Sequence, residues 1–391
     1  MTKVCIYLYS LTSGGAERVA VALAGFLANH NYDVTIITKR GTDMDFYTVP
    51  IEVHRISLNL NGEGKILSKI TENISTWSKL QAHLRKIKPD VLIGMMTDSA
   101  VMSILAGKRS PAKIVVSERN FPGTWSFSLW YTMRKLLYRL ADGHASLTPE
   151  AADWLKQNTG AKNVHIIPNS VQWPMQHIAP IVSPDSMIPV NKKLLLAVGS
   201  RPHVKGFDLL LDAFTKTKND DWVLAILGVD KNSCEKEEYH ALLNQIERLK
   251  LHNKVILPGC VGNVGDWYER ANIFVLSSRN EGFGNVVLEA MAAGCATISF
   301  DCDSGPRHII DHAKNGLLVE AENVDELSKA IDLLMDDPDM RKKLSKKAIE
   351  VRETYSEKNV LGKWVELIEG VQNKSVTKIE NKKVMRDTIS S

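Results

Sequence analysis

The chain has little cysteine and no long apolar segment. Its five cysteines are scattered, and no two of them form a C-x-x-C pair: Cys5, Cys234, Cys260, Cys295 and Cys302. This spacing argues against a structural zinc site and predicts reduced thiols in a cytosolic protein. No uninterrupted apolar run among the 391 residues reaches transmembrane length. Residues 1–9 are apolar, but glycines and charges soon follow, which predicts a first strand and not a signal peptide.

Charge of one sign does not dominate, and the basic residues form no run. The net charge is +4; residues 1–170 contain 20 Lys and Arg against 13 Asp and Glu, or +7, which leaves −3 for the rest. A basic first half suggests an anionic partner, such as a membrane surface, a phosphate or a nucleic acid. Nucleic-acid binding is not expected, because the aromatic residues cluster in one amphipathic segment and the cations do not cluster.

What the chain does have is a regular alternation of short apolar runs and amphipathic helical patterns. This alternation predicts βαβ units with parallel sheets, whose ligands bind at the carboxyl ends of the strands. The length favours two domains. Four prolines crowd a stretch without periodicity, which predicts a linker at 172–192, and the polar tail 373–391 is expected to fray. The predicted strands are 4–9, 34–38, 91–96, 114–117, 164–167, 194–198, 223–227, 255–257, 273–276, 296–300 and 316–319.

The most informative stretch follows the apolar run 273–276. Two carboxylates, Glu281 and Glu289, flank a predicted loop-to-helix junction. Gly284 allows close approach of a ligand to the backbone, and Asn285 is predicted to cap the helix. The N–H groups of that helix start would favour a diphosphate, and the two carboxylates could accept hydrogen bonds from hydroxyls on either side of it. A ligand with two polyols joined by a diphosphate is a nucleotide sugar.

Two further glycine-containing loops follow predicted strands. Gly14 and Gly15 open a helix after the first strand, but they are not part of a G-x-G-x-x-G motif, and the second strand ends in Thr-Lys-Arg without an acidic residue. A nicotinamide cofactor is therefore disfavoured. The loop 199–206 carries Arg201 and Lys205, two cations that could neutralise a diphosphate. Each loop alone is also compatible with a packing turn or with solvated cations.

Together these motifs resemble the retaining glycosyltransferases of family 4, and among them those that build bacterial surface polysaccharides and lipid-linked glycans. The resemblance spans residues 3–370 and includes Ile-Pro-Asn at 167–169, Gly-Pro at 305–306 and Asn-Gly-Leu-Leu at 315–318. It implies the α/β GT-B fold, with two facing Rossmann-like domains, parallel sheets and an inter-domain cleft. Domain 1–171 would bind the acceptor and domain 193–355 the nucleotide sugar, and a helix at 356–372 would pack back toward the N-terminal domain.

The resemblance also implies roles for individual residues. Arg201 and Lys205 would hold the diphosphate, Glu281 would reach the transferred sugar, and Glu289 would bind the ribose hydroxyls. Further donor contacts, largely from the backbone, are expected from Gly14, Gly15, Gly199, Val261, Phe283, Gly284 and Asn285. Retention is expected through front-face attack guided by the leaving phosphate, so no covalent nucleophile is assigned.

This chain departs from the family pattern at two places. Ser200 stands where the family's loop arginine usually follows the glycine, and Arg201 comes one position later. Many relatives have a histidine near position 119, whereas this chain has Glu118 and Arg119; both are assigned to the acceptor side, without the histidine's role. The acidic pair in 301–303 could suggest Mg²⁺ or Mn²⁺, but the cationic loop would already neutralise the diphosphate, so no metal and no other cofactor is expected.

The segment 125–140 interleaves aromatic and apolar residues with Arg134, Lys135 and Arg139. It fits an interfacial helix on anionic lipid, and it fits equally a core helix with a solvated basic side. The sequence leaves both open. The aromatic and apolar members are Trp125, Phe127, Leu129, Trp130, Tyr131, Met133, Leu136, Leu137 and Tyr138.

We therefore expect a cytoplasmic transferase that is peripheral on the inner face of the cytoplasmic membrane. It would move a hexose or N-acetylhexosamine from a UDP-linked sugar to a growing glycan on a polyprenyl diphosphate. The expected partners are the nucleotide sugar, a glycan or lipid-linked acceptor and an anionic membrane surface. Two alternatives stay open: a GT-B-fold nucleotide-sugar epimerase, and a catalytically silent subunit that binds sugar nucleotides.

Overall fold

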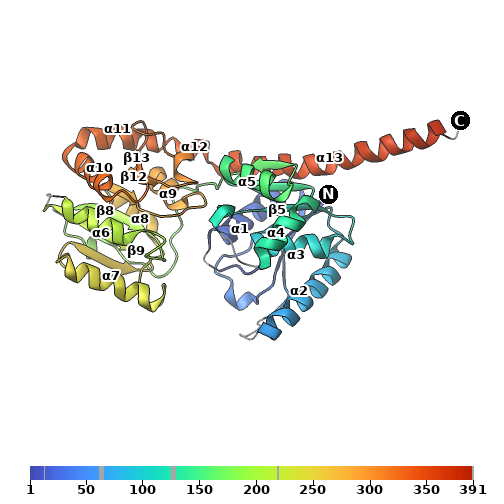
Figure 1. The fold of residues 1–391 in the computed structure, drawn as a ribbon, viewed down its shortest axis with the longest axis horizontal. Coiled ribbons are helices and arrows are strands. Elements are labelled where there is room, and N and C mark those ends of the chain that lie inside the picture. Colours follow the sequence, from blue (N-terminus) through green and yellow to red (C-terminus); the bar gives the residue numbers. More distant parts are fainter. Residues whose placement is uncertain (13, 61–65, 125–128, 218–219, 390–391) are drawn as a thin grey trace. The chain divides into compact units, whose positions relative to one another are not determined.

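The structure is a computed structural model that describes the chain except for residues 13, 61–65, 125–128, 218–219 and 390–391. The chain forms two compact units, and each is described by itself (Figure 1). Unit 1 comprises Met1–Ser170 and Lys358–Ser391, and unit 2 comprises Val171–Glu357. The segment 172–192, predicted as a linker, therefore lies within unit 2.

Unit 1 is built on a seven-stranded parallel sheet in the order β3-β2-β1-β4-β5-β6-β7. Strands β3 and β6 were not predicted, because both are short and β6 has no run of β-branched or aromatic residues. β6 is nevertheless buried along its whole length. The strands are β1 (Thr2–Leu8), β2 (Tyr32–Thr38), β3 (His54–Ser57), β4 (Val91–Met95), β5 (Lys113–Ser117), β6 (Gly143–Ser146) and β7 (Val164–Ile166).

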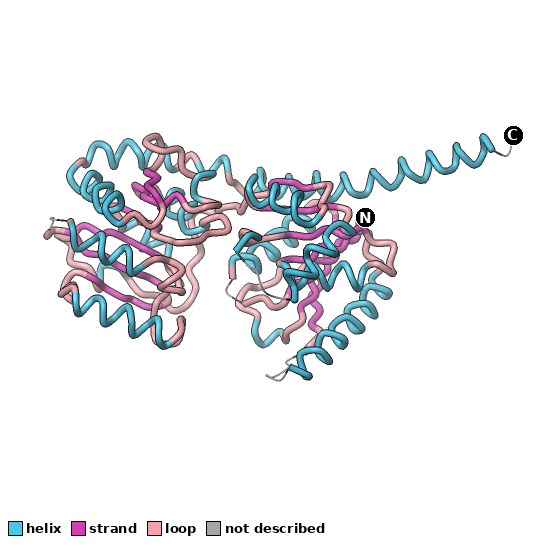
Figure 2. The backbone as a smooth tube through the Cα atoms, in the orientation of Figure 1, coloured by secondary structure: helices cyan, strands magenta, loops and turns pink. Residues whose placement is uncertain are grey.

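Helices flank this sheet (Figure 2). In α1 the apolar residues Val19, Leu23 and Leu27 recur every four positions, so they share one face and are buried against residues of β1 and β2. The α-helices of unit 1 are α1 (Gly15–Asn29), α2 (Ile66–Ile87), α3 (Thr97–Gly107), α4 (Leu129–Leu137), α5 (Pro149–Thr159) and α13 (Glu357–Ile389). Its 3-10 helices are η1 (Thr42–Met44), η2 (Pro122–Thr124) and η3 (Tyr138–Leu140).

The C-terminal helix α13 returns to the N-terminal domain, as predicted. Val360, Trp364, Leu367 and Val371 are buried in the same cluster as residues of β1 and α1. The helix continues to Ile389, whereas the polar composition predicts a frayed tail at 373–391. Residues 374–389 contain neither glycine nor proline, so nothing in the local sequence ends the helix.

Unit 2 is built on a six-stranded parallel sheet in the order β10-β9-β8-β11-β12-β13. The strands are β8 (Lys193–Val198), β9 (Trp222–Leu227), β10 (Val255–Gly259), β11 (Ile273–Leu276), β12 (Ala296–Asp301) and β13 (Leu317–Glu320). The helices are α6 (Phe207–Lys216), α7 (Lys236–Arg248), α8 (Val264–Arg270), α9 (Asn285–Ala293), α10 (Val324–Asp336), α11 (Pro338–Ala348) and α12 (Val351–Thr354), with the 3-10 helices η4 (Pro184–Ser186) and η5 (Pro306–His308).

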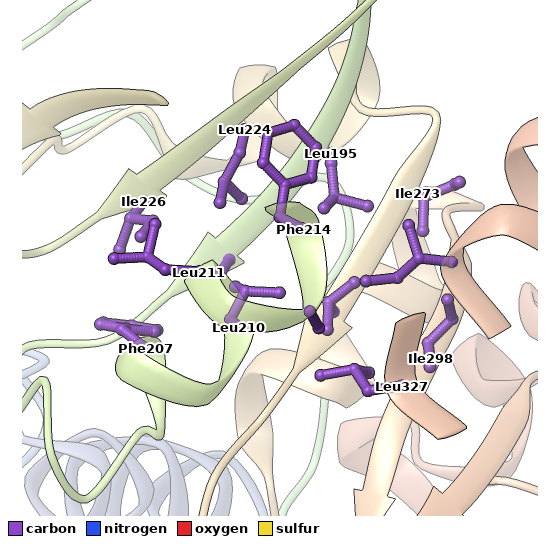
Figure 3. Close-up of a cluster of buried hydrophobic side chains, with 14 of the residues drawn as sticks. Leu195, Phe207, Leu210, Leu211, Phe214, Leu224, Ile226, Ile273, Ile298 and Leu327 are labelled. Atoms are coloured by element: carbon purple, nitrogen blue, oxygen red, sulfur yellow. The ribbon is translucent and has the colours of Figure 1, made fainter. Parts of the chain in front are cut away.

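The core of unit 2 lies between its sheet and the helices α6 and α10. Phe207, Leu211 and Phe214 of α6 pack with Leu195 and Leu224 of the sheet (Figure 3). Burial of each such side chain contributes about 1.5–3 kcal/mol. β8 and β11 contribute Leu195 and Ile273 to this core, so the loops at their carboxyl ends leave from buried strands.

The segment 171–192 runs along α8 and is hydrogen-bonded to it and to the turn before it. The Ile178 amide donates to the Gly262 carbonyl at 3.0 Å, and the Trp267 indole donates to the Val182 carbonyl at 2.9 Å. The side-chain amide of Asn263 donates to the same Val182 carbonyl at 3.0 Å. The prolines that suggested a linker thus belong to an extended segment held by unit 2. Among the described helices of both units, none is long and apolar enough to cross a membrane.

Candidate functional site

The candidate site lies in unit 2, at the carboxyl ends of β8 and β11. These strands are neighbours in a parallel sheet, so the loops that follow them leave from the same edge. The first loop, 199–206, leads into α6, and the second, 277–284, leads into α9. The carboxyl edge of such a sheet is where α/β folds bind ligands.

Lys205 and Glu281, one from each loop, form an ion pair. Lys205 Nζ lies 2.6 Å from Glu281 Oε1, and the two side chains are only 19% and 11% exposed. The hydroxyl of Ser278 donates to the same Oε1 at 2.7 Å. The structure therefore joins two residues that the sequence analysis assigned to different parts of one ligand, through a charge-assisted hydrogen bond.

The two loops are fastened together by their backbones. Gly206 has φ +61°, and a Cβ added there would lie 2.0 Å from the Ser277 carbonyl oxygen, so only glycine fits this crossing. The Ser277 hydroxyl donates to the Lys205 carbonyl at 2.9 Å. The Lys205 stem lies across Gly199, because a Cβ at that glycine would be 2.6 Å from the lysine Cγ. These contacts fix the backbone of Lys205, so that only its side chain can move.

Glu289 lies in the second turn of α9 and is 7% exposed. Its Oε2 accepts a hydrogen bond of 3.2 Å from the hydroxyl of Tyr268, a buried residue of α8. The sequence prediction that Asn285 caps this helix is wrong: Gly284 is the N-cap, with φ +91°, and Asn285 is the first helical residue. The junction requires a left-handed backbone, which glycine adopts without strain.

The remaining donor-side residues are more dispersed. Arg201 is exposed, and its carbonyl accepts a hydrogen bond from the Lys205 amide. Phe283 is buried, with its ring centroid 5.8 Å from that of Tyr355. Val261 follows β10, which β9 separates from β8, so it does not contribute to the Lys205–Glu281 pair. Gly14 and Gly15 belong to unit 1, where they form the N-cap and the first residue of α1.

Glu118 and Arg119, assigned to the acceptor side, are both buried within unit 1. Glu118 is 2% exposed; it pairs with Arg134 at 3.7 Å and accepts hydrogen bonds from Thr97 and Tyr138. Burial raises the pKa of its carboxyl group above 4.5.

Arg119 is 6% exposed and donates to the Ile167 carbonyl and to the Asn169 side chain. Burial lowers its pKa to about 9. The structure thus gives both residues interior partners, and a contact of either with the acceptor stays a prediction.

The three cations of the segment 125–140, two on α4 and one on η3, lie in different environments. Arg134 is an interior residue, on neither the lipid-facing nor the solvated basic side that the sequence left open: it donates to the Pro122 carbonyl at 2.7 Å, and its guanidinium lies 4.6 Å from the Trp154 ring centroid. Lys135 and Arg139 are exposed, and so are Leu129, Leu136 and Leu140, at 67%, 57% and 44%. Residues 125–128, which include Trp125 and Phe127 of this segment, lie outside the described residues.

The acidic stretch 301–303 lies at the end of β12, and one of its carboxylates has a cationic partner. Asp301 accepts a hydrogen bond of 2.8 Å from Arg307. Among the residues that the structure describes, no group of three His, Cys, Asp or Glu side chains is arranged to hold an ion.

Two hydroxyl groups that contact the glutamates were not predicted, those of Ser278 and Tyr268. Ser278 is three residues before Glu281, a spacing common to many serine turns, and Tyr268 is 21 residues before Glu289. Neither spacing carries a signal in a single sequence: the Tyr268 contact arises only when α8 and α9 pack together, and the Ser278 contact depends on the conformation of its loop.

Comparison with known protein families gives two matches that together span most of the chain. Residues 13–172 match the family described as Glycosyltransferase Family 4, and residues 181–351 match the family described as Glycosyl transferases group 1.

Full-length relatives support the same relationship. The chain is 30% identical over 380 residues to an uncharacterized glycosyltransferase of Haemophilus influenzae, covering 93% of this chain and 99% of the relative. It is 28% identical over 359 residues, or 89% of this chain and 94% of the other, to a Campylobacter jejuni enzyme named N-acetylgalactosamine-N,N'-diacetylbacillosaminyl-diphospho-undecaprenol 4-alpha-N-acetylgalactosaminyltransferase. The fold is shared with sucrose-phosphate synthase from Thermosynechococcus elongatus, with a TM-score of 0.82 at 17% identity over 95% of this chain and 99% of that one.

Proposed function

Because the chain belongs to glycosyltransferase family 4 and has the GT-B fold of a glycosyltransferase, we propose that it transfers a sugar from a nucleotide diphosphate to a growing glycan. The donor is a UDP-linked hexose or N-acetylhexosamine, and the anomeric configuration is retained. The acceptor is a glycan on a polyprenyl diphosphate, in the synthesis of a bacterial surface polysaccharide. The Campylobacter relative, whose name includes an acceptor on diphospho-undecaprenol, supports this choice of acceptor and of an N-acetylhexosamine.

The observation that carries the proposal is the pairing of Lys205 with Glu281 at the carboxyl edge of the unit 2 sheet. When the bond from the anomeric carbon to phosphate breaks, negative charge develops on the nucleotide diphosphate. The Lys205 ammonium and the N-terminus of α9 are suited to stabilise that charge. Glu281 then orients the transferred sugar, and Glu289 accepts hydrogen bonds from the ribose.

The test is thermal-shift screening of the purified chain against uridine, guanosine and adenosine diphosphate sugars. Transfer assays with the best binder and a polyprenyl-diphosphate acceptor follow. Stabilisation by a nucleotide sugar and transfer to the acceptor are expected. An epimerised sugar formed from donor alone would identify an epimerase, and nucleotide binding without turnover of any acceptor would identify a silent subunit.

The reaction is proposed to need no metal ion, because Lys205 and the start of α9 supply the positive charge at the diphosphate. Activity should survive excess chelator. Loss of activity in chelator followed by rescue with Mn²⁺ would contradict this.

We place the enzyme in the cytoplasm, peripheral on the inner face of the cytoplasmic membrane. The exposed leucines of α4, with Lys135 and Arg139 beside them, form the kind of surface that binds the headgroup layer of anionic lipid. Vesicle sedimentation tests this with anionic and with neutral lipid. The double variant Lys135→Gln/Arg139→Gln should bind anionic vesicles less than the wild type, and equal binding would remove the proposal. Arg134 is left intact, because its neutralisation would disturb the interior of unit 1.

A further inference from the structure

Two donors of different kind converge on one oxygen of Glu281. Lys205 Nζ lies 2.6 Å and the Ser278 hydroxyl 2.7 Å from Glu281 Oε1. In the proposed reaction Lys205 binds the diphosphate, because a diphosphate attracts the ammonium group more strongly than one carboxylate does. The serine is neutral, fully buried and close to the end of β11, and it has no task assigned so far.

We propose that Ser278 is a positioning residue that holds Glu281 toward the transferred sugar when Lys205 turns to the diphosphate. The inference rests on the proposed function, because it takes the donor and the role of Glu281 from it. Ser278 acts through Glu281 and does not itself contact the substrate.

The local structure gives the two serines of this loop separate tasks. Ser277 donates to the Lys205 carbonyl, so it fixes the backbone from which the lysine extends. Ser278 donates to the Glu281 carboxylate, so it fixes the glutamate side chain. Lys205 can therefore move its flexible stem without loosening its own backbone and without releasing Glu281.

The energetics favour a glutamate that stays in place. If the Glu281 side chain moved together with Lys205 toward the diphosphate, the buried Ser278 hydroxyl would lose the acceptor that it has in this structure. A buried hydroxyl without a hydrogen-bond partner is unfavourable. If Glu281 stays, the serine still satisfies one carboxylate oxygen, and the other oxygen can accept from a sugar hydroxyl. A hydrogen bond to a charged group is also stronger than one between neutral groups.

The experiment compares Ser278→Ala, Ser278→Thr and a matched control, Ser299→Ala. Ser299 is also fully buried in unit 2, but its hydroxyl donates to the Phe300 carbonyl at 2.8 Å in β12, outside the Lys205–Glu281 pair. For each protein we would measure kcat, KM for the donor, the melting temperature, and the affinities for UDP and for the nucleotide sugar found in the screen.

Ser278→Ala is expected to lower kcat by about 10- to 100-fold, in line with the loss of one hydrogen bond to a charged group. Its affinity for UDP, which carries no sugar, should stay near that of the wild type, while the affinity for the nucleotide sugar falls. Ser278→Thr keeps the hydroxyl and should recover most of kcat. Ser299→Ala should retain the wild-type kcat.

Other outcomes overturn the inference. An unchanged kcat in Ser278→Ala would show that the serine does not position Glu281. Equal losses of UDP and nucleotide-sugar affinity together with a lower melting temperature would show that it only stabilises the loop. Failure of the wild type to bind any nucleotide sugar would overturn the proposed function, and this inference with it.

Discussion

Replacement of Lys205 by methionine tests the central pair of the site. Methionine keeps an unbranched stem that can lie across Gly199, but it removes the ammonium group that pairs with Glu281. Two effects follow from the geometry. The diphosphate loses its cation, and the carboxylate of Glu281, 11% exposed, keeps only the hydroxyl of Ser278 as a described donor.

The two effects have different sizes. Loss of one donor to a developing anion costs about 2.7–4 kcal/mol of transition-state stabilisation, so kcat of Lys205→Met should fall by about 10²- to 10³-fold. The partly buried carboxylate left without its charged partner should cost about 1–3 kcal/mol of folding stability. In the double variant Lys205→Met/Glu281→Gln no charge is left unpaired, so most of the stability should return while activity stays low.

A double-mutant cycle compares the wild type, Lys205→Met, Glu281→Gln and the double variant. Urea unfolding and initial rates are measured for all four proteins. Lys216→Met is a suitable control, because Lys216 is also paired, with Asp325, but lies exposed on α6. This control should keep wild-type rates. A kcat of Lys205→Met close to that of the wild type would refute the reasoning. So would a stability loss of the double variant equal to the sum of the losses of the two single variants.

Three further predictions concern other contacts. Tyr268→Phe removes the hydroxyl that donates to Glu289, so calorimetry should show UDP binding weakened by about 3- to 10-fold, and an unchanged affinity would contradict a role in holding Glu289. Arg134→Met should destabilise the protein by about 3–5 kcal/mol in urea, because it leaves the buried Glu118 without its ion-pair partner, whereas Lys135→Met should have little effect; similar effects would contradict the interior position of Arg134. Burial raises the pKa of Glu118, so the ionised form is less favourable in the folded than in the unfolded state, and protonation favours folding. Relative to Glu118→Gln, the wild type should therefore gain stability as the pH falls from neutral toward 4.5 and gain no more below it. If the free energy of unfolding of the wild type, minus that of Glu118→Gln, falls or stays constant over that range, the sign is wrong.

The fold was largely predictable because its elements have strong local patterns. The buried strands of parallel sheets are apolar along their length, so β1, β2, β4 and the strands of unit 2 could be located to within a few residues. β6 could not, because Gly-His-Ala-Ser becomes a strand only between β5 and β7. The prolines of the segment 172–192 are visible in the sequence, but its hydrogen-bond partners are not. The hydrogen bonds to α8 and to the residue before it join residues about 80 positions apart.

The chemical groups of the site were also visible in the sequence, but their contacts were not. Lys205 and Glu281 were identified separately as a cation and a carboxylate after two strands. Their direct pairing was not predicted, because it depends on the adjacency of β8 and β11. Glu118, Arg119 and Arg134 show the opposite case: the first two were assigned to the acceptor side and the third to a basic side, and the structure buries all three with polar partners.

The sequence by itself determined the strand–helix alternation, the two parallel-sheet units and the residue types at the carboxyl ends of β8 and β11, because these depend on periodicity and on local backbone preferences. Only the tertiary structure decided that Ser278 and Lys205 share one oxygen of Glu281, that Tyr268 holds Glu289 and that Arg134 faces inward. The physical reason is that hydrogen bonds and burial depend on which segments pack side by side, and that packing joins residues whose separation along the chain carries no pattern.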